Sequence, residues 1–187
     1  MFLRNGYDPV VIVSDSFKAP ADTVYADPRV TLRTLPLVPV HNEVKKDESF
    51  EMDVESLYRG LSSALEGVSV VITHDVIYQN AALKHNFASR KYAEQHPEVK
   101  WLHWIHSATS PVTLNNLRPY FNDEYLNLVV KPFPNSYYVF FNHYSIPRIA
   151  LNFGVPESAV KVVHHPTDIC GFLGISKEVE EVIDSKK

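Results

Sequence analysis

The side chains best suited to chemistry in this sequence are histidines that directly follow short apolar segments. His74 and Asp75 follow the segment VSVVIT, and His106 and Ser107 follow the aromatic segment that begins at Lys100. An imidazole changes protonation near neutral pH, and a neighbouring carboxylate or hydroxyl can orient it. Because the aromatic segment stops abruptly at small hydroxyl residues, we expect the chemistry of this chain to face His106.

Short apolar segments alternate with helical patterns along the chain. Strands are predicted at residues 10–13, 30–40, 68–73, 100–106, 137–141 and 160–163, and helices at residues 47–67, 80–95 and 145–153. In the first helix, Phe50, Val54, Leu57 and Leu61 recur at helical spacing, which predicts one apolar stripe. This alternation predicts an α/β fold with a Rossmann-like, open, mostly parallel sheet flanked by helices.

Five of the predicted strands end in polar, mostly histidine-containing segments. These are SDS, THD, HSATS, NHYS and HHPTD, in chain order. In open α/β sheets, ligands bind outside the carboxyl ends of the strands. The sequence therefore predicts a binding site at that edge of the sheet, with His106 near its centre.

Composition and charge exclude several classes of protein. The net charge of −4 and the pI near 6.1 give no electrostatic case for binding nucleic acid. No apolar run approaches the roughly 20 residues of a membrane span, so we expect no transmembrane segment. The single cysteine, Cys170, excludes an internal disulfide and fits a reducing compartment. We expect a cytoplasmic protein, and leave open a peripheral position at a membrane.

The sequence contains no motif typical of a metal site or of a phosphate-binding loop. His103 and His106 are three residues apart, so on a strand their side chains point to opposite faces and cannot chelate one ion. We therefore expect no metal site. No glycine-rich phosphate loop and no G-x-S-x-G motif occurs. For His74 and Asp75 two interpretations stay open: they cap nearby backbone amides, or they hold a polar substrate beside His106.

Taken together, these segments resemble the N-terminal domain of GT-B glycosyltransferases, in the retaining group related to glycogen and sucrose synthases. Residues 7–15 resemble the second strand of that domain, and residues 68–75 its D-V-V-H-x-H strand. Residues 101–110 resemble the strand that bears the inter-domain histidine, here His106. Residues 137–145 resemble a strand that ends in a serine, and residues 160–168 resemble V-x-V-I-P-N-G-V-D, with His164-His165-Pro166 in place of Pro-Asn-Gly.

The resemblance implies an acceptor half-site. His106 would be the catalytic histidine near the transferred sugar, and His74, Asp75 and Ser107 would bind a sugar, lipid or glycan acceptor. It implies no cofactor, because the nucleotide-sugar donor is a co-substrate bound mainly by a second domain. That domain would follow Lys187. We therefore expect residues 1–175 to form the acceptor-side domain and residues 176–187 to be a linker or helical tail toward the donor-binding domain. We expect the chain alone to be inactive.

The resemblance also implies that the family's first strand would precede Met1. In the doubly wound order 3-2-1-4-5 that strand is central, and its absence leaves the strands at residues 10–13 and 68–73 with unpaired edges. We expect these edges to pair with each other, or self-association or a complementing chain to fill the gap. The alternative to a transferase is a non-catalytic, Rossmann-like binding or assembly module.

Overall fold

A computed structural model describes most of the chain in five stretches. These are residues 3–21, 23–36, 48–75, 82–106 and 131–164, together with residues 123, 126–127, 179, 181–182 and 185–186. Ser107, His165 and Cys170 lie outside the described residues, as do residues 107–122, on which no statement of structure is made. The boundary expected at residue 175 also lies outside them and stays a prediction.

The described helices and strands alternate as the sequence predicts. They are β1 (Val10–Ser14), β2 (Thr31–Leu35), α1 (Phe50–Ala64), β3 (Val70–His74), α2 (Leu83–Gln95), β4 (Lys100–Trp104), β5 (Ser136–Phe140), α5 (Ile146–Phe153) and β6 (Val160–Val162). Short 3₁₀ turns cover Leu3–Asn5, Val24–Ala26, His143–Ser145 and Glu157–Ala159. Gly154, at φ 62°, ends α5 in the left-handed conformation that glycine adopts without strain.

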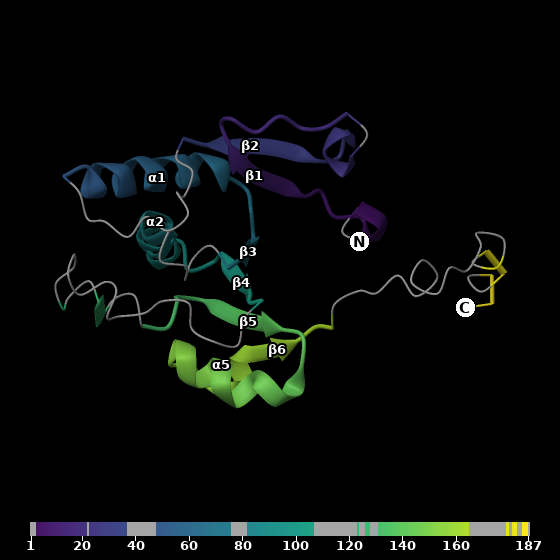
Figure 1. Ribbon diagram of the computed structural model, residues 1–187. Helices are drawn as coiled ribbons and strands as arrows, with labels where there is room; N and C mark the ends of the chain where they lie inside the picture. Colours follow the sequence, from purple (N-terminus) through teal and green to yellow (C-terminus); the bar gives the residue numbers. More distant parts are fainter. Residues whose placement is uncertain are drawn as a thin grey trace.

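All strand pairs are parallel, and the strands form two groups. β1 pairs with β2, and a four-stranded sheet has the order β3-β4-β5-β6. Parallel neighbours need a crossover between them: α2 lies on the crossover from β3 to β4 and α5 on the crossover from β5 to β6, whereas α1 connects β2 to β3 of the other group (Figure 1). The predicted Rossmann-like α/β fold with helices flanking parallel strands is confirmed.

The described helices pack on one side of the strands, which we call the helix face. Tyr92 of α2 lies edge-on to Trp101 of β4, with ring centroids 6.3 Å apart. Phe153 of α5 stacks on Tyr138 of β5 at 4.6 Å. One buried cluster joins these residues to Leu57 and other apolar side chains of α1. The apolar stripe predicted for the first helix is therefore the part of α1 that faces the core.

α1 approaches β2 closely because residue 60 is a glycine. A Cβ atom at Gly60 would lie 3.0 Å from a methyl carbon of Leu35 and 3.3 Å from the ring of Pro36. At the far end of α1, the guanidinium of Arg33 donates to the carbonyls of Ala64 and Glu66 at 2.7 and 2.9 Å. These contacts hold β2 against the same helix that leads to β3.

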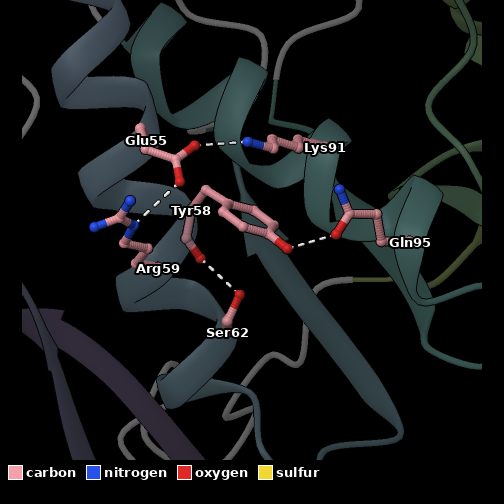
Figure 2. Close-up of polar contacts among 6 residues, drawn as sticks. All are labelled: Glu55, Tyr58, Arg59, Ser62, Lys91 and Gln95. Carbon is pink, nitrogen blue, oxygen red and sulfur yellow. Dashed lines mark hydrogen bonds and ion pairs between the residues drawn. The ribbon is translucent and has the colours of Figure 1, made fainter.

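Polar side chains join α1 to α2 (Figure 2). Lys91 of α2 donates to Glu55 of α1 at 2.6 Å, and Arg59 donates to the other carboxylate oxygen at 3.1 Å. The Tyr58 hydroxyl bonds to Gln95, and the Lys91 ammonium lies 4.3 Å from the centroid of the Tyr58 ring. The Lys91 contact is the main cause that lowers the pKa of Glu55. These contacts are exposed, so they orient the two helices more than they stabilise them.

Two expectations about the ends of structural elements need correction. The sequence offers Asp47 or Ser49 as the cap of the first helix; Asp47 lies outside the described residues, and the Ser49 hydroxyl bonds to the carboxylate of Asp53 and makes no cap to a helix amide. Asp53 also accepts from the ammonium of Lys84 at 2.6 Å, so its carboxylate is held in place and takes the Ser49 hydroxyl as a second donor. The edges of β1 and β3 do not pair with each other in the described part of the chain, so the first of the two expected outcomes is wrong for this structure.

None of the helices in the described ranges combines the length and apolar character that crossing a membrane requires.

His103 is the most unusual core residue, because it is polar and fully buried. Its Nδ1 lies 2.9 Å from the Thr73 hydroxyl, and its Nε2 has no hydrogen-bond partner among the described residues. Burial, with a smaller effect from the charge of Arg90, lowers the pKa of His103 from 6.5 to about 3. The imidazole is therefore neutral in the folded protein across the physiological range.

We predict that His103 makes the protein less stable in mild acid. Below about pH 6.5 the unfolded chain binds a proton at this residue, whereas the folded chain does so only near pH 3, so the free energy of unfolding falls as the pH falls between these values. At about pH 5 the loss is about 2 kcal/mol. Urea unfolding of the wild type and His103→Gln at about pH 7 and pH 5 measures it. The variant should lose about 2 kcal/mol less than the wild type, and an equal loss in both would contradict the prediction.

Candidate functional site

The structure brings three of the four residues predicted for the site together. His74 ends β3, Asp75 follows it, and His106 lies two residues beyond the end of β4. Because β3 and β4 are parallel neighbours in register, with His74 opposite Trp104, their carboxyl ends meet at one edge of the sheet. We call His74, Asp75 and His106 the edge site. Ser107, the fourth predicted residue, lies outside the described residues.

Two hydrogen bonds join the members of the edge site. His74 Nδ1 lies 3.1 Å from His106 Nε2, and the two rings stack at 5.4 Å with an interplanar angle of 21°. The backbone N–H of His106 donates to Asp75 Oδ1 at 3.0 Å. Since a hydrogen bond between two imidazoles needs one donor and one acceptor, the pair cannot keep this bond when both rings are protonated.

A left-handed turn at Asp75 allows this arrangement. Asp75 has φ 53°, a conformation that aspartate tolerates better than most residues, and its backbone N–H donates to the carbonyl of Trp104 at 3.2 Å. The turn directs the carboxylate back to the amide of His106. Of the two interpretations of His74 and Asp75 that the sequence left open, capping therefore describes Asp75, while the His74 ring contacts the ring of His106.

Trp104 is a neighbour of the edge site that the sequence analysis missed. Its ring stacks on His74 at 5.8 Å with an interplanar angle of 18°, so that His74 lies against both Trp104 and His106. Residues 104 and 106 are two apart on a strand and its extension, which places them on one face. The same alternation puts His103 on the helix face. His103 and His106, which are three residues apart, therefore lie on opposite faces, as the sequence predicts.

The pKa of His74 is lowered by its surroundings. The packed rings remove water from part of the imidazole, and this burial is the largest cause. The charge of His106 lowers the pKa further, and the carboxylate of Asp75 raises it. His74 is therefore neutral at neutral pH and can hold a hydrogen bond to His106 in either direction.

Two further histidines lie at the same edge of the sheet. His143 follows β5 and His164 follows β6, with ring centroids 6.1 Å apart. His164 Nδ1 lies 2.9 Å from the carbonyl oxygen of Phe141, so it donates to that carbonyl. No group of three or more His, Cys, Asp or Glu side chains in the described ranges is arranged to hold a metal ion.

Comparisons of the chain with protein-family models, curated proteins and solved structures found no match. The resemblance to glycosyltransferases therefore rests on the residues and motifs of the sequence alone.

We predict that two substitutions shift the pKa of His74 in opposite directions. His106→Gln removes a positive charge, so the pKa of His74 should rise, while staying below its ordinary value because the burial against Trp104 remains. Asp75→Asn removes a negative charge, so the pKa should fall. Titration of the His74 ring protons by nuclear magnetic resonance measures both shifts.

His96→Gln is the matched control for this titration. His96 precedes β4 at its amino end and pairs with Glu98, so its loss should leave the pKa of His74 unchanged. Shifts of the same sign in His106→Gln and Asp75→Asn would show that the three side chains do not form the edge site in solution.

Proposed function

We propose that the chain is the acceptor-binding domain of a GT-B type glycosyltransferase, which transfers a sugar from a nucleotide-sugar donor to a hydroxyl of its acceptor. One observation carries the proposal: the three described residues of the predicted acceptor half-site meet at the carboxyl edge of a parallel sheet. Ligands of open α/β folds bind at this edge. The resemblance to the family predicted the same residues from the sequence.

The chemistry of the edge site suits an acceptor hydroxyl. Sugar transfer breaks the bond from the sugar to the nucleotide phosphate, forms a bond to the acceptor oxygen, and releases the proton of that hydroxyl. His74 and His106 are both exposed. A neutral imidazole can accept a hydrogen bond from a hydroxyl and take its proton. The protonated ring can then donate a hydrogen bond to a neighbouring imidazole. In this proposal His106 contacts the reacting groups, and His74 and Asp75 orient it and bind the acceptor.

Ser107 and a second domain would complete the acceptor site and the donor site. Ser107 would bind the acceptor beside His106. The donor would be held by a second domain, and its phosphate charge would be met there, since the edge site offers no arginine or lysine among its described members. No cofactor or metal takes part in the proposed role of this domain.

A non-catalytic binding or assembly module is the second candidate function. It is favoured by the edges of β1 and β3 that pair with no other strand among the described residues, because open edges of apolar strands promote association with other chains. Sedimentation of the purified chain tests it: a stable complex that never supports sugar transfer, even after fusion to a donor domain, would favour assembly over catalysis.

We predict that the chain supports sugar transfer when it is fused to the donor-binding domain of a retaining GT-B enzyme. His106→Ala in that fusion should lower turnover by a factor of about 100 or more, because a positioned group at the reacting atoms is lost. Release of the nucleoside diphosphate with a panel of simple glycoside and lipid acceptors measures the rate. His96→Ala, at the opposite edge of the sheet, should leave the rate within about twofold.

Each outcome of this experiment has a separate meaning. An unchanged rate in His106→Ala would reject the role of His106, while leaving the assignment of the domain intact. Absence of transfer in a fusion that folds and binds its donor would reject the transferase proposal itself.

A further inference from the structure

The backbone edges of β1 and β3 that face away from their partners pair with no other strand in the described part of the chain, although the Ser14 carbonyl at the end of β1 accepts from the Phe17 N–H at 3.0 Å. Among the described strands, β1 pairs with β2 alone, and β3 pairs with β4 alone. In a parallel strand, successive residues turn their N–H and C=O groups to alternate sides. The backbone hydrogen bonds of each strand therefore show which residues face its partner and which face away.

Three residues of β1 face away from β2. The Pro9 carbonyl accepts from Thr31, and the Asp15 amide donates to Leu35, so residues 9, 11, 13 and 15 turn toward β2. The N–H and C=O groups of Val10, Ile12 and Ser14 therefore point to the other side. Every non-proline residue brings one donor and one acceptor, and leaving them unpaired inside a sheet costs free energy.

Three residues of β3 face away from β4 by the same argument. The Ser69 carbonyl accepts from Lys100, and the Asp75 amide donates to Trp104, so residues 69, 71, 73 and 75 turn toward β4. The backbone groups of Val70, Ile72 and His74 therefore point away. We call these two sets, on β1 and β3, the open edges.

The open edges have the orientation of two strands of one sheet. Ile12 and Val71 both pack against the same buried cluster, so both side chains lie on the helix face. The backbone N–H and C=O groups of Ile12 point to the open edge, and those of Val71 point to β4. Trp101 also lies on the helix face, and its N–H donates to Asn135, which precedes β5. All three strands therefore run in the same sense across the sheet. Figure 1 shows β1 on the side of the two-stranded sheet that is nearer to β3.

The side chains along the open edges select an uncharged, apolar partner. β1 reads VVIVS and β3 reads VVITH, so neither strand offers a charged side chain before its last residue. Continuous Val and Ile runs are typical of parallel strands that have neighbours on both sides. Val70 is nevertheless 50% exposed. An open strand edge of this composition is a template on which another strand can pair.

We propose that the open edges bind one extended, β-branched apolar strand of another polypeptide, which lies parallel to β1 and β3 and joins them into one sheet. Alternate residues of such a strand would bond to Val10, Ile12 and the N–H of Ser14 on one side and to Val70, Ile72 and His74 on the other. Because a parallel strand ends at the carboxyl edge, the residue after it would lie beside His74. The bound polypeptide would thereby complete one wall of the edge site. The inference does not depend on the proposed reaction.

The experiment supplies the strand to the whole chain. A Val-Ile-Val-Ile-Val segment is joined ahead of Met1 by a glycine-serine linker of about fifteen residues, which spans up to about 50 Å and holds the segment at millimolar effective concentration. Amide hydrogen exchange is then followed by nuclear magnetic resonance. The amides of Val10, Ile12, Val70 and Ile72 should exchange at least about tenfold more slowly than in the unmodified chain.

A matched control carries proline in place of both isoleucines of the added segment, which removes its ability to pair along a sheet. In the control, the four amides should exchange as fast as in the unmodified chain. The amides of Val11 and Val71, which turn toward β2 and β4, should be protected in every version.

Three results would overturn the proposal. Protection of only one of the two open edges would show that they do not flank a single strand. Unchanged exchange at both would show that no strand is accepted. Slow exchange at both in the unmodified chain, together with a dimer in sedimentation, would identify a second copy as the occupant. None of these measurements uses sugar transfer, so their failure is distinct from failure of the proposed function.

Discussion

The alternation of side chains along β4 is the constraint on which both the core and the edge site depend. Trp101, His103 and Ile105 enter the core on the helix face, whereas Trp104 and His106 lie on the opposite side. A shift of the strand by one residue would exchange the two sets. It would bury His106 and expose Trp101, so the packing of the core fixes the face on which the edge site forms.

Parallel pairing then converts this local alternation into a site. β3 and β4 are joined in register through the crossover of α2, so His74 and His106 reach the same edge although 32 positions separate them. The helix layer restrains the strands, because α1 and α2 are linked by apolar packing and by the contacts of Lys91 and Tyr58 (Figure 2). A buried, neutral His103 is tolerated beneath the site because Thr73 provides one hydrogen bond.

The sequence analysis predicted the elements well, because the signals of helices and strands are local. Apolar spacing marked α1, and the helix predicted at residues 145–153 is α5, which ends at Phe153. It was less successful wherever a contact links distant residues. The Ser49 hydroxyl bonds to Asp53, which is itself held by Lys84 of α2, and Trp104 contacts His74 of another strand. Ser107 stays a prediction, because it lies outside the described residues.

The sequence by itself determined the α/β class, the opposite faces of His103 and His106, and the position of several histidines after strand ends, because these follow from side-chain periodicity. Only the tertiary structure decided that Asp75 turns left-handed to hold the amide of His106, and that His74 lies between two rings. It also decided that β1 and β3 do not pair with each other in the described part of the chain. These features depend on how strands far apart in sequence are placed, and a local pattern carries no information on that placement.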